Sequence, residues 1–237
     1  MPVAEPGVGV ETVDLATTAL RELNARLHGA GRAGIASRWR VVHPHGAHAV
    51  AVGIDAEIEV DVDGHVGYYC AGMNQLATVR VHGNAGVGLA ENIMSGTVCV
   101  DGYAGQSCAA TGRGGLVVVQ GDASARCGIS MKGVDIVVRG SVGHMSAFMA
   151  QTGRLVVCGG AGEALGDSIY EARLYVRGAV TSLGADCVEK ELRDEHVAEL
   201  TGLLERAGVT DAAPADFRRY GSARRLYNFN VDHAGEY

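Results

Sequence analysis

A pattern of apolar and polar positions recurs along the middle of the chain at a fixed interval of 19 residues. In each copy, two aliphatic residues stand two positions apart, and a polar residue usually follows the second one. The first copy has Val60 and Val62, followed by Asp63. Alternation with a period of two is typical of a β-strand with one buried face. The pattern therefore predicts one such strand in every copy.

Glycine ends each predicted strand. The chain has 35 glycines among 237 residues, roughly twice the average usage. Seven of them recur every 19 residues and are the predicted structural corners: Gly64, Gly83, Gly102, Gly121, Gly140, Gly159 and Gly178. Further small residues recur three and seven positions after each of these. Because glycine adopts backbone angles that a Cβ forbids, a repeated glycine predicts a repeated corner.

A unit of strand, corner, strand and corner that repeats in register predicts one coil of a parallel β-helix. A left-handed hexapeptide helix requires a multiple of six residues, and 19 is not one, so the right-handed form is favoured. We expect an all-β fold, a right-handed parallel β-helix of about seven 19-residue coils with flanking helices. Residues 57–185 form this β-helix, between an N-terminal cap (1–56) and a C-terminal helix with an extended tail (186–237).

The flanking segments have patterns that differ from the repeat. Leucines from Leu15 to Leu27 have helical spacing and predict a helix that stops near Gly29. Residues 39–42 and 48–52 predict lead-in strands. The stretch from Val188 to Leu204 predicts a second helix, which ends near Gly208. Because open coil ends expose unpaired backbone, these flanks are expected to cap the solenoid.

One outward-facing position predicts a covered surface. Three residues before the corner glycines, the middle of the repeat is apolar, with Val118, Val137 and Val156, followed by Tyr175. A strand that is apolar on both faces is usually covered on both, here either by a flanking helix of the chain or by another subunit. These four residues are therefore a candidate interface.

The C-terminal segment from 217 to 237 carries aromatic residues and arginines, which are enriched at protein interfaces. It is either a tail packed along its own rod or an arm that docks on another chain. Its candidate interface residues are Arg218, Arg219, Arg224 and Arg225.

The net charge of −7 argues against nucleic-acid binding, which usually shows a basic face. The sequence contains no run of eighteen apolar residues, so it predicts no transmembrane helix. The first residues lack the pattern of a secretory signal, so we expect a cytoplasmic protein.

Two side-chain clusters are candidates for chemistry. Three histidines between His43 and His48 have a spacing that suits zinc or copper, but no carboxylate stands nearby, and solvated loop histidines are the default interpretation. Cys70, Cys108 and Cys127 occupy equivalent positions of the repeat and are expected to stack as reduced thiols in the core.

The glycine-rich run from Gly83 to Gly88 resembles a phosphate-binding loop only superficially, because each such run leads into another coil instead of a helix. No nucleophile–base pair lines up across the coils. The sequence therefore predicts no catalytic, cofactor-binding or metal-binding residue in this chain.

The glycine-rich repeat resembles the GXGXG β-helix domain that ends the large subunit of glutamate synthase and that also occurs in a subunit of formylmethanofuran dehydrogenase. The more specific stretches are YYCAGMNQ (68–75), SARCGISMKG (124–133) and GHMSAFMAQ (143–151). With both flanks, they resemble the free-standing small subunit of three-subunit glutamate-synthase-like enzymes such as methylamine–glutamate N-methyltransferase, also called N-methylglutamate synthase.

This resemblance implies a non-catalytic structural and interface subunit of a hetero-oligomer. The implied partners are a glutamine amidotransferase subunit and an FMN-binding synthase subunit. It implies no cofactor on this chain; FMN belongs to a partner subunit, where an iron–sulfur cluster is a further candidate. Two alternatives stay open: the corresponding β-helix component of a formylmethanofuran dehydrogenase, and an autonomous β-helix that binds a ligand.

Overall fold

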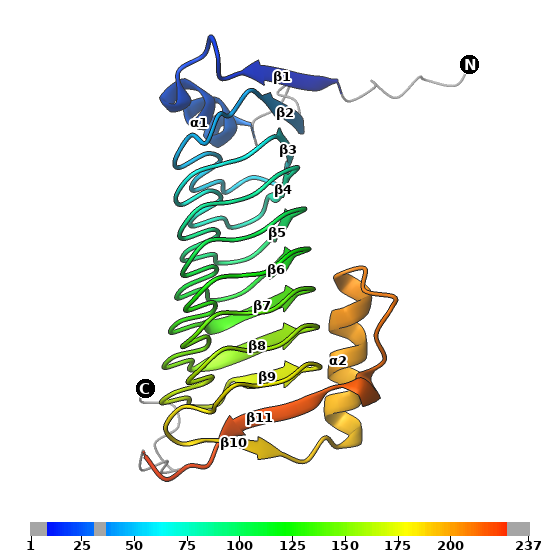
Figure 1. Cartoon of the computed structure of the whole chain (residues 1–237). Helices are drawn as coiled ribbons and strands as arrows, with labels where there is room; N and C mark the ends of the chain where they lie inside the picture. The colour runs from blue at the N-terminus through cyan, green and yellow to red at the C-terminus, as the bar shows by residue number, and fades with distance from the viewer. Residues whose placement is uncertain (1–8, 31–36, 227–237) are drawn as a thin grey trace, which may run out of the picture.

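Seven parallel strands, one for each 19-residue repeat, stack along one face of a rod (Figure 1). The computed structural model describes residues 9–30 and 37–226. The strands of the repeat are β3 (Glu59–Asp63), β4 (Thr78–Val81), β5 (Thr97–Val100), β6 (Leu116–Val119), β7 (Lys132–Val138), β8 (Thr152–Val157) and β9 (Arg173–Val176). This arrangement confirms the predicted right-handed parallel β-helix.

The register of the strands follows the sequence repeat. Val60 pairs with Val79, and Val79 pairs with Val98, so equivalent residues of successive copies lie side by side. The inward aliphatic residues of all seven strands are fully buried. One irregularity occurs in β7, between Lys132 and Asp135. A single apolar core therefore runs through the stack, because no coil buries its own apolar face alone.

The stack also extends toward the N-terminus beyond the repeat. Strands β1 (Val10–Asp14) and β2 (Arg38–Val42) pair in parallel with each other, and β2 pairs in parallel with β3. The predicted lead-in strand at 39–42 is thus confirmed as β2. The strand predicted at 48–52 is wrong, because this segment is a series of turns. Ala49 and Ala51 there have φ values of 57° and 56°, which extended backbone does not adopt.

The side of each coil opposite the sheet is built from turns with left-handed backbone. Non-glycine residues with positive φ recur five, seven and nine positions after the corner glycine, as in Ser107 (59°), Ala109 (54°) and Thr111 (56°). Their N–H groups point alternately along the rod. Ser107 and Thr111 donate to the following coil, and Ala109 donates to the preceding one. The turns therefore pair their backbone polar groups between coils, as a strand would.

The corner glycines are required for close stacking rather than for special backbone angles. Among the seven, only Gly64 has a positive φ, of 132°. At Gly83, an added Cβ would lie 2.6 Å from the carbonyl carbon and oxygen of Gly64 in the preceding coil. The prediction that these glycines supply forbidden angles is therefore wrong for the other six. They make room for the backbone of the neighbouring coil.

Helix α1 (Leu20–Gly29) closes the N-terminal end of the rod, where the sequence predicts a helical cap. Leu23 and Leu27 are fully buried in the apolar core. Asn24 pairs with the turn segment that follows β2: its Nδ2 donates to the Ala49 carbonyl at 2.9 Å, and its Oδ1 accepts from the Ala51 N–H at 3.0 Å. The side-chain amide thus satisfies backbone groups at the end of the stack.

The C-terminal end is closed by a different arrangement. After β9 the chain forms β10 (Cys187–Lys190), α2 (Asp194–Arg206), a short 3₁₀ helix (Pro214–Asp216) and β11 (Arg218–Ser222). Strand β11 lies between β9 and β10 and is antiparallel to both. The second predicted helix exists, but Val188 belongs to β10. In the described residues, neither helix is long and apolar enough to cross a membrane.

Candidate interaction surfaces

The apolar outward stripe of the sheet is covered by the chain itself. Val118, Val137, Val156 and Tyr175 are buried together with Leu200 and other residues of α2 and the segment that follows it. Figure 1 shows α2 running alongside the C-terminal half of the sheet. Of the two alternatives for these four residues, the structure shows the flanking helix. Their assignment as a candidate interface with another chain is therefore corrected, because α2 already removes their apolar surface from water.

A polar cluster fixes α2 on the sheet. Glu199 of α2 accepts hydrogen bonds from the Tyr175 hydroxyl at 2.6 Å, from Arg154 Nε at 2.8 Å and from Arg173 Nη1 at 2.8 Å. Burial alone raises the pKa of Glu199, but these hydrogen bonds outweigh it and hold the pKa below its ordinary value. The carboxylate stays charged, so α2 is tied to two strands by charge-assisted contacts.

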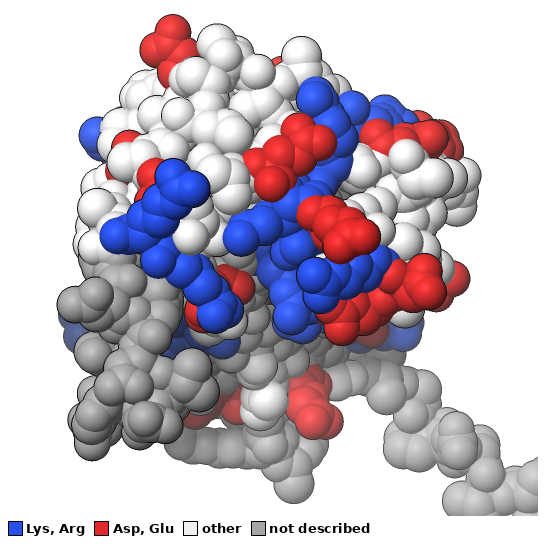
Figure 2. All heavy atoms as spheres, turned by 90° about the horizontal axis from the view of Figure 1, so that it is seen from below, with Lys and Arg blue, Asp and Glu red and all other residues white. Residues whose placement is uncertain are grey.

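The predicted C-terminal arginines lie at the end of the rod among acidic residues. Arg218 faces Glu189 at 3.8 Å, and Arg224 pairs with Glu171 at 2.9 Å. Arg219 Nε donates to a backbone carbonyl at 2.8 Å. Figure 2, viewed from this end, shows positive and negative side chains interspersed.

Strand β11 places the first part of the segment after residue 217 within the sheet of its own rod, with Phe217 buried. Arg225 is exposed, and its backbone N–H donates to Asp186 at 3.0 Å. Tyr227 and the rest of the predicted arm lie outside the described residues. The described arginines thus take part in contacts within the chain, and their role toward a partner stays a prediction.

The N-terminal half of the same sheet face carries charged side chains, which pair with one another across neighbouring strands. Arg80 lies 3.1 Å from Glu59, and His82 lies between Asp61 at 3.1 Å and Asp101 at 2.8 Å. The hydrogen bond to Asp101 is the main cause that raises the pKa of His82, and burial opposes it. Opposite charges on adjacent coils neutralise each other here, which is typical of a solvated face.

The turn side of the first coils exposes aromatic side chains that the sequence analysis missed. Tyr68 and Tyr69 are about half exposed, and Tyr68 stacks on His48 with ring centroids 4.5 Å apart. A Cβ at Gly86 or Gly88 of the next coil would lie 3.0 or 2.6 Å from these tyrosine rings. Glycine therefore makes room for rings that lie along the rod. Tyrosine is enriched at interfaces, so this is a candidate contact surface.

A second exposed surface lies at the corner where the turns lead back to the sheet. We call Met73, Leu76 and Met94 the methionine corner; these side chains are 51%, 49% and 45% exposed. The sequence carries a local signal for the exposure of Met94. Arg113 and Lys132 occupy the equivalent position of the next two coils, eleven residues after the corner glycine, and charged residues are typical of an exposed position.

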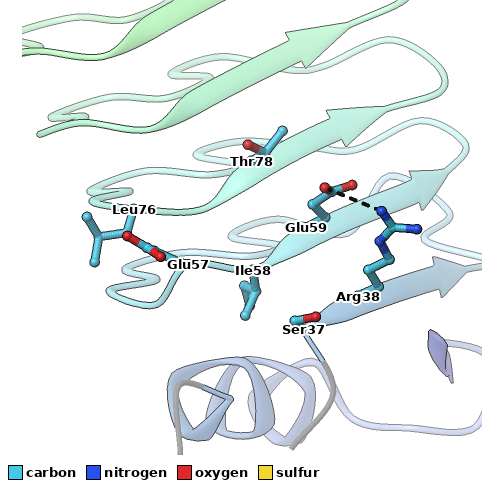
Figure 3. Close-up of a pocket in the computed structure, with 7 residues that line it drawn as sticks. All are labelled: Ser37, Arg38, Glu57, Ile58, Glu59, Leu76 and Thr78. Carbon is cyan, nitrogen blue, oxygen red and sulfur yellow. Dashed lines mark ion pairs between the residues drawn. The ribbon is translucent and has the colours of Figure 1, made fainter. Parts of the chain in front are cut away.

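A hollow of about 570 Å³ lies beside Leu76 at the start of strands β2, β3 and β4. Figure 3 shows its lining, with Glu57 and Leu76 away from the Arg38–Glu59 ion pair. The hollow combines apolar, hydroxyl and carboxylate side chains with the guanidinium group of Arg38.

The histidines between His43 and His48 do not converge on one point. His43 Nδ1 lies 2.9 Å from an Asp14 carboxylate oxygen, and His45 stacks on His43. His48 Nδ1 instead accepts the Tyr68 N–H at 2.8 Å. Among the described residues, no group of three or more His, Cys, Asp or Glu side chains is placed to hold a metal ion.

The six cysteines are all free thiols. Cys70, Cys108 and Cys127 are fully buried in the core, where the sequence predicts a stack. Burial raises the pKa of Cys70 to about 12. Cys127 has its pKa raised by a hydrogen bond with Cys108 and by burial. Cys70 and Cys127 therefore remain protonated at neutral pH. All three cysteines pack as small apolar side chains.

Taken together, the fold and these surfaces define a parallel β-helix with α1 at its N-terminal end and α2 covering one face of its C-terminal half. The chain is 64% identical over 225 residues to Protein GlxC from Rhizobium meliloti (strain 1021), and the alignment covers 95% of this chain and 99% of that protein. The chain therefore belongs to the GlxC family. No protein-family model and no solved structure matches it.

Proposed function

We propose that this chain is a non-catalytic structural and interface subunit of a glutamate-synthase-like complex of the N-methylglutamate synthase type. In this proposal it holds together a glutamine amidotransferase subunit and an FMN-dependent synthase subunit. FMN and any iron–sulfur cluster belong to the partner subunits. The observation that carries the proposal is the 19-residue glycine repeat, which resembles the GXGXG domain and which stacks as a parallel β-helix.

The surfaces support a role in assembly. A continuous 11-stranded sheet with α1 at its N-terminal end and α2 on one face is a rigid platform, because every coil is hydrogen-bonded to its neighbours. Six of the exposed large apolar side chains come from the short stretch between residues 68 and 103. They are tyrosines, methionines and a leucine. They lie at several positions around neighbouring coils, and tyrosine and methionine are enriched at interfaces.

Affinity purification of the full-length tagged chain from its native host tests the proposal. We expect a glutamine amidotransferase chain and an FMN chromophore to co-purify with it. A molybdopterin protein as the partner would instead support the formylmethanofuran dehydrogenase alternative. A monomer that turns over a substrate alone would refute both and would support an autonomous protein. The isolated chain is the control for glutaminase activity, which it is expected to lack.

A further inference from the structure

Strand β1 is the edge of the sheet at the N-terminal end of the rod. Among the described strands it pairs with β2 alone, and Figure 1 shows it as the first strand of the stack. The Leu15 N–H, just after β1, donates to the Val42 carbonyl. Because backbone groups alternate in direction along a strand, those of Glu11 and Val13 also point toward β2, and those of Thr12 point away from the sheet. Such an edge can pair with a strand of another molecule.

The inward column of the β-helix carries a carboxylate at this edge. Val60 of β3 lies in register with Trp39 of β2, and Trp39 lies in register with Glu11 of β1. All seven strands of the repeat have a buried aliphatic residue in this column, and Trp39 is only 2% exposed. Strand β1 instead places a charged side chain there. The apolar column of the core thus ends at a carboxylate on the last strand.

An ion pair with α1 holds this carboxylate in place. Arg26 of α1 pairs with Glu11, and the two side chains are 36% and 33% exposed. The Arg26 guanidinium also lies over the Trp39 ring, 5.7 Å from the ring centroid, where a cation is attracted by the aromatic face. The ion pair therefore stands over the last aromatic side chain of the core and keeps part of its own surface in water.

A further strand on β1 would take this ion pair out of water. Paired strands lie about 4.8 Å apart, so an inward side chain of the added strand would stand beside Glu11 and Arg26. Removing two charges from water often costs more than their attraction returns. Inward-pointing charged residues on an edge strand are one means by which natural sheets avoid edge-to-edge pairing.

We propose that the Glu11–Arg26 ion pair prevents the β1 edge from pairing with a second copy of this chain. A second copy offers two terminal strands for such pairing, β1 with five residues and β10 with four. The ion pair keeps both away from β1, so the rod ends there and copies do not join through this end into a longer sheet. This inference goes beyond the proposed function, because it concerns copies of the chain and not the other subunits.

Glu11→Val with Arg26→Leu tests the inference in the isolated full-length chain, by analytical ultracentrifugation over a range of concentrations. Valine suits a strand and leucine suits a helix, so both changes extend the apolar column without opposing the local structure. We expect the dissociation constant for self-association to fall about tenfold or more below that of the wild type. Circular dichroism confirms that the variant folds. If it unfolds, Glu11→Gln with Arg26→Met removes the charges with less change in side-chain volume, and the same direction is expected.

Thr12→Pro, added to the wild type and to the double variant, identifies the edge that is used. Proline removes the N–H that points away from the sheet and leaves the hydrogen bonds to β2 in place. It should abolish the added self-association of the double variant and leave the wild type unchanged. Glu59→Val with Arg80→Leu is the matched control, since it removes an ion pair of similar exposure, 42% and 40%, from the sheet face. This control should show no self-association that depends on the β1 edge.

Two results would overturn the inference. One is a folded double variant that associates no more than the wild type, or whose association persists with Thr12→Pro. The other is a wild-type chain whose self-association is abolished by Thr12→Pro, because its β1 edge would then pair despite the ion pair. Neither result bears on whether other subunits bind the chain, so the proposed function is tested separately.

Discussion

Replacing Gly83 with alanine tests why glycine recurs at the corners. The added Cβ would lie 2.6 Å from the carbonyl carbon and oxygen of Gly64, about 0.8 Å short of ordinary contact at 3.4 Å. Both atoms are backbone, so no flexible side chain can move aside. The two coils must separate locally, which strains adjacent hydrogen bonds such as the 2.9 Å bond from the His82 N–H to the Val62 carbonyl.

Overpacking of this kind costs about 1–3 kcal/mol, and the rigid stack places Gly83→Ala near the upper value. For a chain of this size, the melting temperature should therefore fall by about 6–12 °C. Thermal unfolding followed by circular dichroism measures this shift in the full-length chain.

Gly202→Ala is the matched control with the opposite expectation. Gly202 lies inside α2, and no atom stands within 4 Å of its added Cβ. Because glycine disfavours a helix interior, this change should stabilise the fold by about 0.5–1 kcal/mol. If Gly83→Ala melts within about 1 °C of the wild type while Gly202→Ala behaves as expected, close stacking is not the reason for the corner glycines.

Three further changes test the caps and the sheet face. Val137→Glu places a carboxylate beneath α2 and should destabilise the isolated chain by about 3–5 kcal/mol; urea unfolding equal to that of the wild type would show that α2 does not cover this position. Asn24→Ala removes two hydrogen bonds to the first turns and should cost about 1–3 kcal/mol, with faster amide exchange confined to that end of the rod. His82 has a raised pKa beside Asp61 and Asp101, so its contribution to stability is present below about pH 6.5 and is lost as pH rises through the folded-state pKa. His82→Gln should therefore lower the urea midpoint at acidic pH and leave it unchanged at alkaline pH, and an equal loss at both would contradict this linkage.

The sequence predicts the stack of coils because one residue pattern repeats without an insertion. The aliphatic residues at positions such as Val60 and Val62 mark every strand, and the structure pairs them in register. The strands before the repeat, β1 and β2, have a weaker signal in the sequence. Where the others have a corner glycine, the coil of β2 has His43, and it is two residues longer, so the period is lost.

The surfaces were less predictable than the core. An apolar stripe at Val118 and Val137 indicates that something covers the sheet, but the covering group depends on where a distant helix returns. Similarly, the sequence shows that glycine recurs at the corners. Only the structure shows whether glycine is needed there for a positive φ or for room beside the backbone of the next coil. The exposed methionine corner does not stand out in the sequence, because its three members come from different positions of the repeat.

The most direct test of the account is native mass spectrometry of the complex purified through the full-length chain. We predict a single hetero-oligomer that contains this chain, an amidotransferase subunit and a third subunit carrying the mass of bound FMN. The chain measured alone as a monomer, under conditions in which the candidate partners are present in the same cells, would contradict its role as an interface subunit.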